Sequence, residues 1–179
     1  MTTTLKIDFV SDIACPWCAV GLGALEGALE RLQGEVKADL HFQPFELNPN
    51  MQAGGQDLVE HITQKYGSTP EQQVQMRQNI SDRGAEVGFA FAPGGRGRVY
   101  NTFDAHRLLH WAHETGTPGQ QHALKKALLA AYQGRAECIE DHAVLLACVS
   151  EVGLDLATAQ SILQSDTYAL DVRAREQFY

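Results

Sequence analysis

Two cysteines separated by two residues lie near the start of the chain, in the stretch DIACPWCAVG. They are Cys15 and Cys18, with Pro16 and Trp17 between them. A pair at this spacing can form a redox-active dithiol, supply half of a zinc site, or pack as two small apolar side chains. The elements on either side of the pair help to decide among these chemistries.

The pair lies between a predicted strand and a predicted helix. Residues 5–10 (LKIDFV) alternate apolar and polar side chains, as a strand does, and an apolar stripe at helical spacing predicts a helix over 16–33. Pro16 suits the first helical position, so we expect Cys15 at the helix N-terminus, where unpaired N–H groups and the helix dipole favour a thiolate. Cysteines in such places have lowered pKa values. We therefore predict that Cys15 attacks and that Cys18, one turn further on, resolves.

The two other cysteines bear on the alternatives. A zinc site usually needs a second pair of ligands, and Cys138 and Cys148, ten residues apart, do not form one. Cys148 has apolar neighbours at helical spacing, which indicates a core position, and Cys138 follows a predicted turn as a free thiol or as a partner for Cys148. The strand–CxxC–helix context favours a redox pair over a structural one. We expect no metal ion here.

A second strand and a long series of helices follow the pair. Residues 36–42 (VKADLHF) alternate again, and Ser68 is the predicted N-cap of a helix, with Glu71 completing a capping box. Two short strands do not form a stable sheet by themselves. We therefore expect further strands beyond residue 179, or a sheet completed by a second chain, as in a homodimer. The predicted helices cover 57–66, 70–87, 101–115, 119–132, 141–152 and 166–179, with one more capped by Asp155.

Composition and charge are those of an ordinary globular protein. Of the 179 residues, 44% are apolar and 20% are charged. The net charge is −8 and the basic residues are scattered, which argues against nucleic acid and predicts that they lie on a solvated surface. We see neither a secretory leader nor an apolar run long enough to span a membrane. We therefore expect a cytoplasmic protein, in which stable disulfides are rare.

Three stretches together, SDIACPWCAVG, PFELNPNM and NTFDAHRLLHWA, resemble the DsbA-like thioredoxin-fold family, in particular its FrnE-like subgroup of cytoplasmic dithiol oxidoreductases. The resemblance runs from about residue 5 to residue 179. It implies an α/β, thioredoxin-like fold with a large inserted helical domain. Residues 1–47 would form the first part of the thioredoxin-like domain, 48–164 the all-helical insertion, and 165–179 a helix that returns to the first domain.

The resemblance also implies an activity and partners. It implies thiol–disulfide exchange, with Cys15 as nucleophile, Cys18 as resolving thiol, and a disulfide-containing protein or a small-molecule thiol as partner. It implies no resident cofactor, with glutathione as a candidate co-substrate. In the family, a cis-proline loop and two further strands follow the insertion, and none of the six prolines here occupies that place. We therefore expect a native chain that extends past residue 179.

Residues near the pair are candidates for tuning the thiols and for binding substrate. Pro16 and Trp17, the two residues between the cysteines, help to set the redox potential of the pair. Asp12, three residues before Cys15, is placed to tune the thiol, or else it starts a turn. The stretch after the second strand contains Phe45, Leu47 and Pro49. These three residues form either one wall of an apolar groove for a peptide or small disulfide, or a packed connection between strand and helix.

The stretch NTFDAHRLLHWA supplies further candidates. In the family this stretch faces the dithiol, so the resemblance makes Asn101 and His106 candidate substrate contacts, although Asn101 is also a good helix N-cap. His106 and His110 are four residues apart and share a helix with His113, a spacing that can ligate a metal. No acidic residue sits in register as in an HExxH motif, so we expect a solvated or packed histidine stripe and no metal.

The favoured function is a thiol–disulfide oxidoreductase that uses the CPWC dithiol. One alternative is a glutathione-dependent isomerase or transferase, similar to the kappa-class transferases and the hydroxychromene-carboxylate isomerases. Cys18 argues against it, because those relatives carry one serine or cysteine where this chain has a dithiol. The other alternative is a non-catalytic, thiol-linked chaperone that holds unfolded chains.

Overall fold

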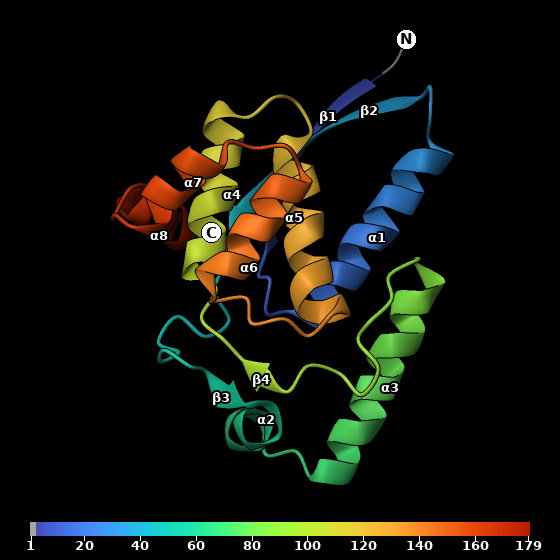
Figure 1. The fold of residues 1–179 in the computed structure, drawn as a ribbon. Coiled ribbons are helices and arrows are strands. Elements are labelled where there is room, and N and C mark those ends of the chain that lie inside the picture. The colour runs from blue at the N-terminus through green and yellow to red at the C-terminus, as the bar shows by residue number, and fades with distance from the viewer. Residues whose placement is uncertain (1–2) are drawn as a thin grey trace.

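The sheet of this protein contains two parallel strands in residues 3–179, the part of the chain that the computed structural model describes. β1 (Thr3–Ser11) pairs with β2 (Val36–Pro44) in a register that places Phe9 beside Phe42. α1 (Pro16–Arg31) connects the two strands, as the crossover of a parallel pair requires (Figure 1). The predicted strand–helix–strand order is therefore confirmed, and completion of the sheet by further strands or by a second chain stays a prediction.

Helices make up most of the remaining structure, and the predicted ones begin within a few residues of their predicted starts. No helix within residues 3–179 is both long and apolar enough to cross a bilayer. The helices after β2 are α2 (Leu58–Tyr66), α3 (Pro70–Glu86), α4 (Phe103–Thr115), α5 (Gln120–Leu129), α6 (His142–Glu151), α7 (Leu156–Leu163) and α8 (Ala169–Phe178).

Two elements were not predicted. β3 (Gln56–Asp57) and β4 (Arg98–Val99) form a short antiparallel pair that joins the segment before α2 to the segment before α4. A π-helical turn over Ala130–Gly134 follows α5. Neither has a clear pattern in the sequence, because a two-residue strand is too short for alternation and a π-helical turn resembles an α-helix in its side-chain spacing.

The cap of α3 differs from the predicted one. Thr69, and not Ser68, is the N-cap, because its hydroxyl accepts the backbone N–H of Gln72 and its own N–H donates to the Gln72 side chain. A capping box joins the N-cap to the third helical residue. Because the N-cap is Thr69 and not Ser68, the residue that completes the box is Gln72 and not Glu71.

The apolar core lies where the helices after residue 100 meet β2. α4, α5 and α8 all contact β2, so parts of the predicted inserted domain lie directly on the sheet. The division into residues 1–47, 48–164 and 165–179 stays a prediction. Wholly buried core residues from α4, α5 and α6 include Leu108, Leu124, Leu128, Leu145 and Val149.

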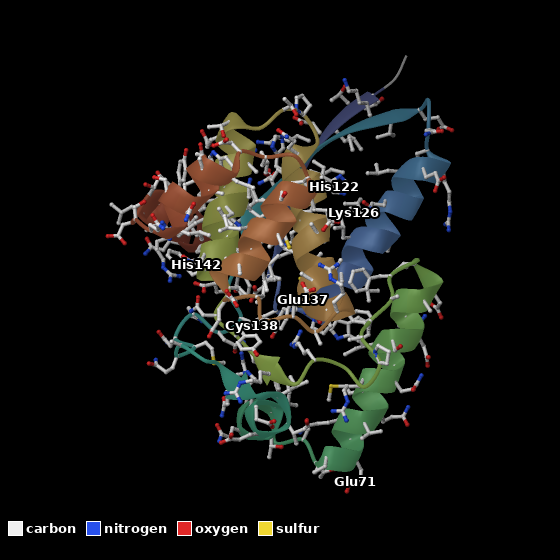
Figure 2. All side chains as sticks on the ribbon, viewed as in Figure 1. Glu71, His122, Lys126, Glu137, Cys138 and His142 are labelled. Atoms are coloured by element: carbon white, nitrogen blue, oxygen red, sulfur yellow. The ribbon has the colours of Figure 1, made fainter. Side chains whose placement is uncertain are left out.

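Helix α1 is held in place by two neighbours. A Cβ added at Gly23 would lie 2.9 Å from Cγ2 of Val87, so the end of α3 approaches α1 closely. From α5, Nε2 of His122 and Nζ of Lys126 lie 2.7 Å and 2.9 Å from Glu26 Oε1 (Figure 2). α1 therefore packs closely on α3 through a steric contact and meets α5 through a partly exposed charged cluster.

We expect Gly23→Ala to lower the free energy of unfolding by about 1–3 kcal/mol, because the added methyl group overpacks the contact with Val87. Gly27→Ala, one turn further along α1, is the matched control. No atom lies within 4 Å of a Cβ added there, so we expect it to raise stability by about 0.5–1 kcal/mol through helix propensity. Urea denaturation measures both, and equal effects of the two substitutions would contradict the close packing of α1 on α3.

Candidate active site

Cys15 is the N-cap residue of α1. Its backbone is extended, with φ −89° and ψ 112°, and Pro16 occupies the first helical position. The Cys15 sulfur receives a hydrogen bond from the Cys18 thiol and interacts with the backbone N–H groups of Cys18 and Trp17. The structure thus places the pair at the junction of the segment after β1 with α1, with both cysteines half-buried and free.

The two thiols have very different acidities. The hydrogen bond from Cys18 has the largest effect and lowers the pKa of Cys15 to about 6; the N–H groups of Cys18 and Trp17 also lower this pKa, whereas burial opposes them. The same hydrogen bond, burial and the negative charge of Cys15 raise the pKa of Cys18. At neutral pH, Cys15 is therefore mainly a thiolate and Cys18 keeps its proton.

The carboxylate of Asp12 is buried beneath the pair and joins three segments of the chain. Its four hydrogen-bond partners are Ala14 N at 3.1 Å, Leu47 N at 2.7 Å, Thr102 Oγ1 at 2.7 Å and His106 Nε2 at 3.3 Å. Burial by itself raises the pKa of Asp12, but the hydrogen bonds and the electrostatic influence of His106 outweigh it and hold this pKa below its usual value. Asp12 therefore remains ionised and connects the CxxC segment to the end of β2 and the start of α4.

The π-helical turn provides a second connection to the CxxC segment. Gln133 Nε2 donates to the carbonyl of Ile13 at 2.8 Å, and the backbone carbonyl of Gln133 accepts the N–H of Ala92 at 2.9 Å. Figure 1 shows the start of α1 beside the end of α5 and the segment that leads from α3 to β4. Sequence reasoning does not identify Gln133, because a turn of this kind has no distinctive pattern.

Lys125 of α5 is wholly buried, and the charges of Asp12, Cys18 and Cys15 act on it. The prediction that the basic residues lie on a solvated surface is therefore wrong at this position. A signal for its burial was present, because Lys125 shares its helix face with apolar residues three, four and seven positions further on. Those residues are Leu128, Leu129 and Tyr132.

An open groove of about 510 Å³ begins beside the CxxC segment, a volume typical of small-ligand sites. Leu47, whose N–H is bound by Asp12, lies at one end of it. Of the predicted groove wall, Leu47 and Pro49 line this space, whereas Phe45 is 44% exposed and lies outside the lining. The lining consists of residues 47–52 with Gly55, Gln56 and His61.

Asn101 and His106 both lie close to the site but differ in exposure. The side chain of Asn101 donates to the carbonyl of Met51 at 3.4 Å and accepts the N–H of Phe103 at 2.9 Å. Asn101 therefore connects a residue of the groove lining, Met51, to the first residue of α4. His106 is only 2% exposed and faces Asp12. The side chain of His106 is therefore engaged with Asp12, and contact of Asn101 and His106 with substrate stays a prediction.

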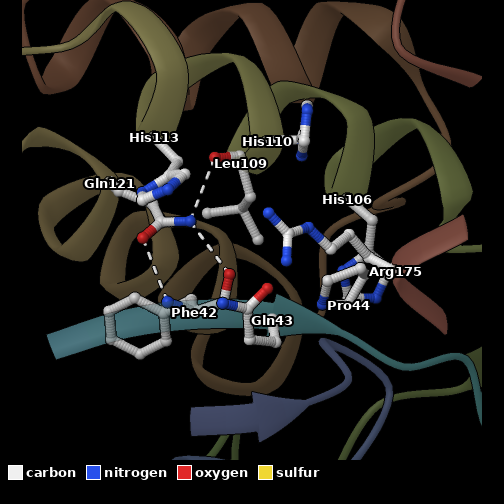
Figure 3. Close-up of a pocket in the computed structure, with 9 residues that line it drawn as sticks. All are labelled: Phe42, Gln43, Pro44, His106, Leu109, His110, His113, Gln121 and Arg175. Atoms are coloured by element: carbon white, nitrogen blue, oxygen red, sulfur yellow. Dashed lines mark hydrogen bonds between the residues drawn. The ribbon is translucent and has the colours of Figure 1, made fainter. Parts of the chain in front are cut away.

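The three histidines of α4 border a cavity of about 10 Å³, which has room for about one water molecule (Figure 3). His113 Nδ1 lies 3.4 Å from His41 Nδ1, and the ring of His110 packs near Tyr168. Among residues 3–179, no three His, Cys, Asp or Glu side chains are grouped in a way that could hold a metal ion. Along this stripe, His106 is buried, His110 is half-buried and His113 is exposed, so it runs from the interior to the surface.

The other two cysteines lie away from the pair. Cys148 is buried in the core, as predicted, and burial raises its pKa to about 11. Cys138, labelled in Figure 2, is half-buried in the segment before α6 and interacts with Tyr100. Both are free thiols in the structure.

We expect Asp12→Ala to lower the free energy of unfolding by about 3 kcal/mol or more, because it leaves several buried donors without an acceptor. The same change at Asp155, an exposed carboxylate that caps α7, is the control and should cost about 1 kcal/mol. Urea denaturation of the two variants compares them directly. Similar losses would show that Asp12 does not organise the three segments.

Comparisons with known proteins agree with this arrangement. A family model described as a DSBA-like thioredoxin domain matches residues 6–178. The uncharacterised protein YwbO of Bacillus subtilis (strain 168) is 28% identical over 165 residues, which cover 92% of this chain and 74% of that protein.

Solved structures give the same result. The crystal structure of a probable DsbA oxidoreductase from Streptomyces coelicolor matches with a TM-score of 0.86 and 32% identity, over 96% of this chain and 73% of that one. The cytosolic disulfide reductase DsbM from Pseudomonas aeruginosa, solved with GSH, matches with a TM-score of 0.59 and 18% identity, over 97% of this chain and 76% of that one. At this level of identity, the match shows a shared fold and nothing more. The narrower FrnE-like assignment stays a prediction. The chain has a DsbA-like thioredoxin fold and belongs to the family of DSBA-like thioredoxin domains.

Proposed function

We propose that this protein is a thiol–disulfide oxidoreductase that works through Cys15 and Cys18. Membership of the DSBA-like family supports this class of chemistry in general. The observation that carries the specific proposal is the acidity difference within the pair, with the pKa of Cys15 lowered to about 6 and that of Cys18 raised. A nucleophilic thiolate beside a protonated second thiol is the arrangement that two-step exchange needs.

In the first step, the Cys15 thiolate attacks one sulfur of a substrate disulfide. The substrate S–S bond breaks, one substrate sulfur leaves as a thiolate, and the other is joined to Cys15 in a mixed disulfide. In the second step, Cys18 loses its proton and attacks the Cys15 sulfur. The second substrate thiolate leaves, so the substrate is reduced by two electrons and the pair is oxidised to the Cys15–Cys18 disulfide.

We infer that the partner is a disulfide-containing protein or a small-molecule thiol. A thiol such as glutathione would return the oxidised pair to the dithiol by the reverse chemistry, and the electron balance then closes without a resident cofactor. The DsbM structure that resembles this fold was solved with GSH, which supports glutathione as a candidate co-substrate. That protein is described as cytosolic, which supports our proposal of a cytoplasmic location.

The groove beside the CxxC segment supports a substrate site. Leu47 and Pro49 supply apolar surface, and several side-chain amides from the same loop supply hydrogen-bonding groups. Trp17 and Phe45 are exposed apolar side chains on the two segments that Asp12 joins, the start of α1 and the exit from β2. We propose that these residues contact substrate, that Pro16 and Asp12 tune the pair, and that Asn101 and His106 act as positioning residues.

Reduction of the insulin disulfides tests the function. We expect activity in the wild type, no activity in Cys15→Ser, and a trapped mixed disulfide in Cys18→Ser, which mass spectrometry detects. Equal behaviour of all three proteins would overturn the proposal. Glutathione-dependent turnover that survives Cys18→Ser would favour the isomerase or transferase, and binding of an unfolded client by Cys15→Ser without any insulin reduction would favour the chaperone.

The pH dependence of Cys15 alkylation tests whether the pKa of Cys15 is lowered by its hydrogen bond from Cys18. Because only the thiolate reacts, we expect the rate with iodoacetamide to be half-maximal near pH 6 and to fall below it. In Cys18→Ala, which removes the hydrogen-bond donor with the largest effect, the midpoint should move to higher pH. A wild-type midpoint near the ordinary thiol value of 9, unchanged in the variant, would disprove the interaction.

A further inference from the structure

Lys125 is a buried charged residue for which the fold alone gives no reason. It is 0% exposed, and among residues 3–179 no group lies within hydrogen-bond distance of its Nζ. A buried amine without a partner is unfavourable for folding, and an apolar side chain of similar length would fill the same space without that penalty. Such a group therefore suggests a functional role.

The position of Lys125 on α5 places it between two contacts with the chain around the pair. One turn earlier, Gln121 exchanges hydrogen bonds with the backbone of Phe42 in β2 (Figure 3). Two turns later, Gln133 binds the carbonyl of Ile13. Lys125 occupies the same helix face between these contacts, which directs it towards the interior behind the CxxC segment.

The second step of the exchange needs a group that accepts a proton from Cys18. Burial and the hydrogen bond to Cys15 raise the pKa of Cys18, so its thiolate does not form readily by itself. Asp12 is a poor acceptor, because its carboxylate already receives hydrogen bonds from four donors and its pKa is lowered. The Nε2 atom of His106 is engaged with the same carboxylate.

We propose that Lys125 is the proton acceptor for Cys18 in the resolving step. The proposal rests on the exchange chemistry proposed above. The neutral amine takes the Cys18 proton through one bridging water molecule, which leaves an ammonium near a thiolate. The thiolate attacks the Cys15 sulfur, the substrate thiolate departs, and the ammonium then releases its proton to that thiolate or to water.

The charges around Lys125 favour this transfer at the right stage. Burial lowers the pKa of Lys125 to about 8, while Asp12, Cys18 and Cys15 act to raise it. When Cys15 enters the mixed disulfide, its negative charge disappears, so the pKa of Lys125 falls further. The same loss of charge lowers the pKa of Cys18, which the Cys15 thiolate had raised. In the mixed disulfide, a larger fraction of Lys125 is therefore neutral, and Cys18 loses its proton more easily.

Reaction with Ellman's reagent separates the two steps, because each releases one coloured thiolate. Attack by Cys15 gives the first release and attack by Cys18 the second, and Cys18→Ser supplies the background from the other cysteines. We expect Lys125→Met to slow the second release by about 100-fold at neutral pH and to change the first by less than about threefold. Lys126→Met, the exposed neighbour, is the matched control and should behave as the wild type.

A pH series distinguishes proton transfer from a structural effect. In the wild type, the second rate should rise with an apparent pKa below 8, because the Lys125 pKa of about 8 falls when Cys15 enters the mixed disulfide, and this titration should disappear in Lys125→Met. Thermal denaturation should show that Lys125→Met is at least as stable as the wild type, since an unpaired buried amine has been removed. Lys125→Arg provides a second variant, because arginine keeps the charge but does not give up its proton. It should also slow the second step.

Several results would overturn the role of Lys125 while leaving the oxidoreductase function intact. The first is an unchanged second release in Lys125→Met, and the second is equal slowing of both releases in that variant. The third is a normal second step in Lys125→Arg, which would indicate that a positive charge at this position is sufficient without proton transfer. A wild type that gives no second release would overturn the exchange chemistry as well.

Discussion

The buried carboxylate of Asp12 is the interaction on which the geometry of the site depends. A charge removed from water must be surrounded by donors, and here they come from the CxxC segment, the exit from β2 and the start of α4. Meeting this requirement brings together segments that are far apart in the chain. The start of α1, the first residue of the groove and Asn101 next to the N-cap of α4 therefore keep fixed positions relative to one another.

The chemistry of the pair follows from one shared proton. The thiol of Cys18 donates to the sulfur of Cys15, and this single bond stabilises one thiolate while it opposes ionisation of the other thiol. Such an arrangement favours attack by the first sulfur and delays the second until the first has lost its charge. The buried amine of Lys125 is near enough to both sulfurs for changes in their charge to alter its pKa.

Much of the fold could be predicted from local patterns. The alternation in β1 and β2, the proline at the start of α1 and the helical periodicity after residue 57 are properties of neighbouring residues, so they needed no tertiary information. Errors arose where several residues offered the same chemistry, as at the cap of α3, where Ser68 and Thr69 are adjacent. They also arose where a pattern was too short, as in β3 and β4.

The sequence by itself determined that Cys15 stands at the junction of the segment after β1 with α1, because Pro16 and the flanking periodicities are local. Only the tertiary structure decided what surrounds that sulfur. Thr102 and His106 reach Asp12 across 90 and 94 residues, Gln133 reaches Ile13 across 120, and Lys125 reaches the pair from α5. Burial of these polar side chains depends on how distant helices pack on β2, and no pattern within one segment specifies that packing.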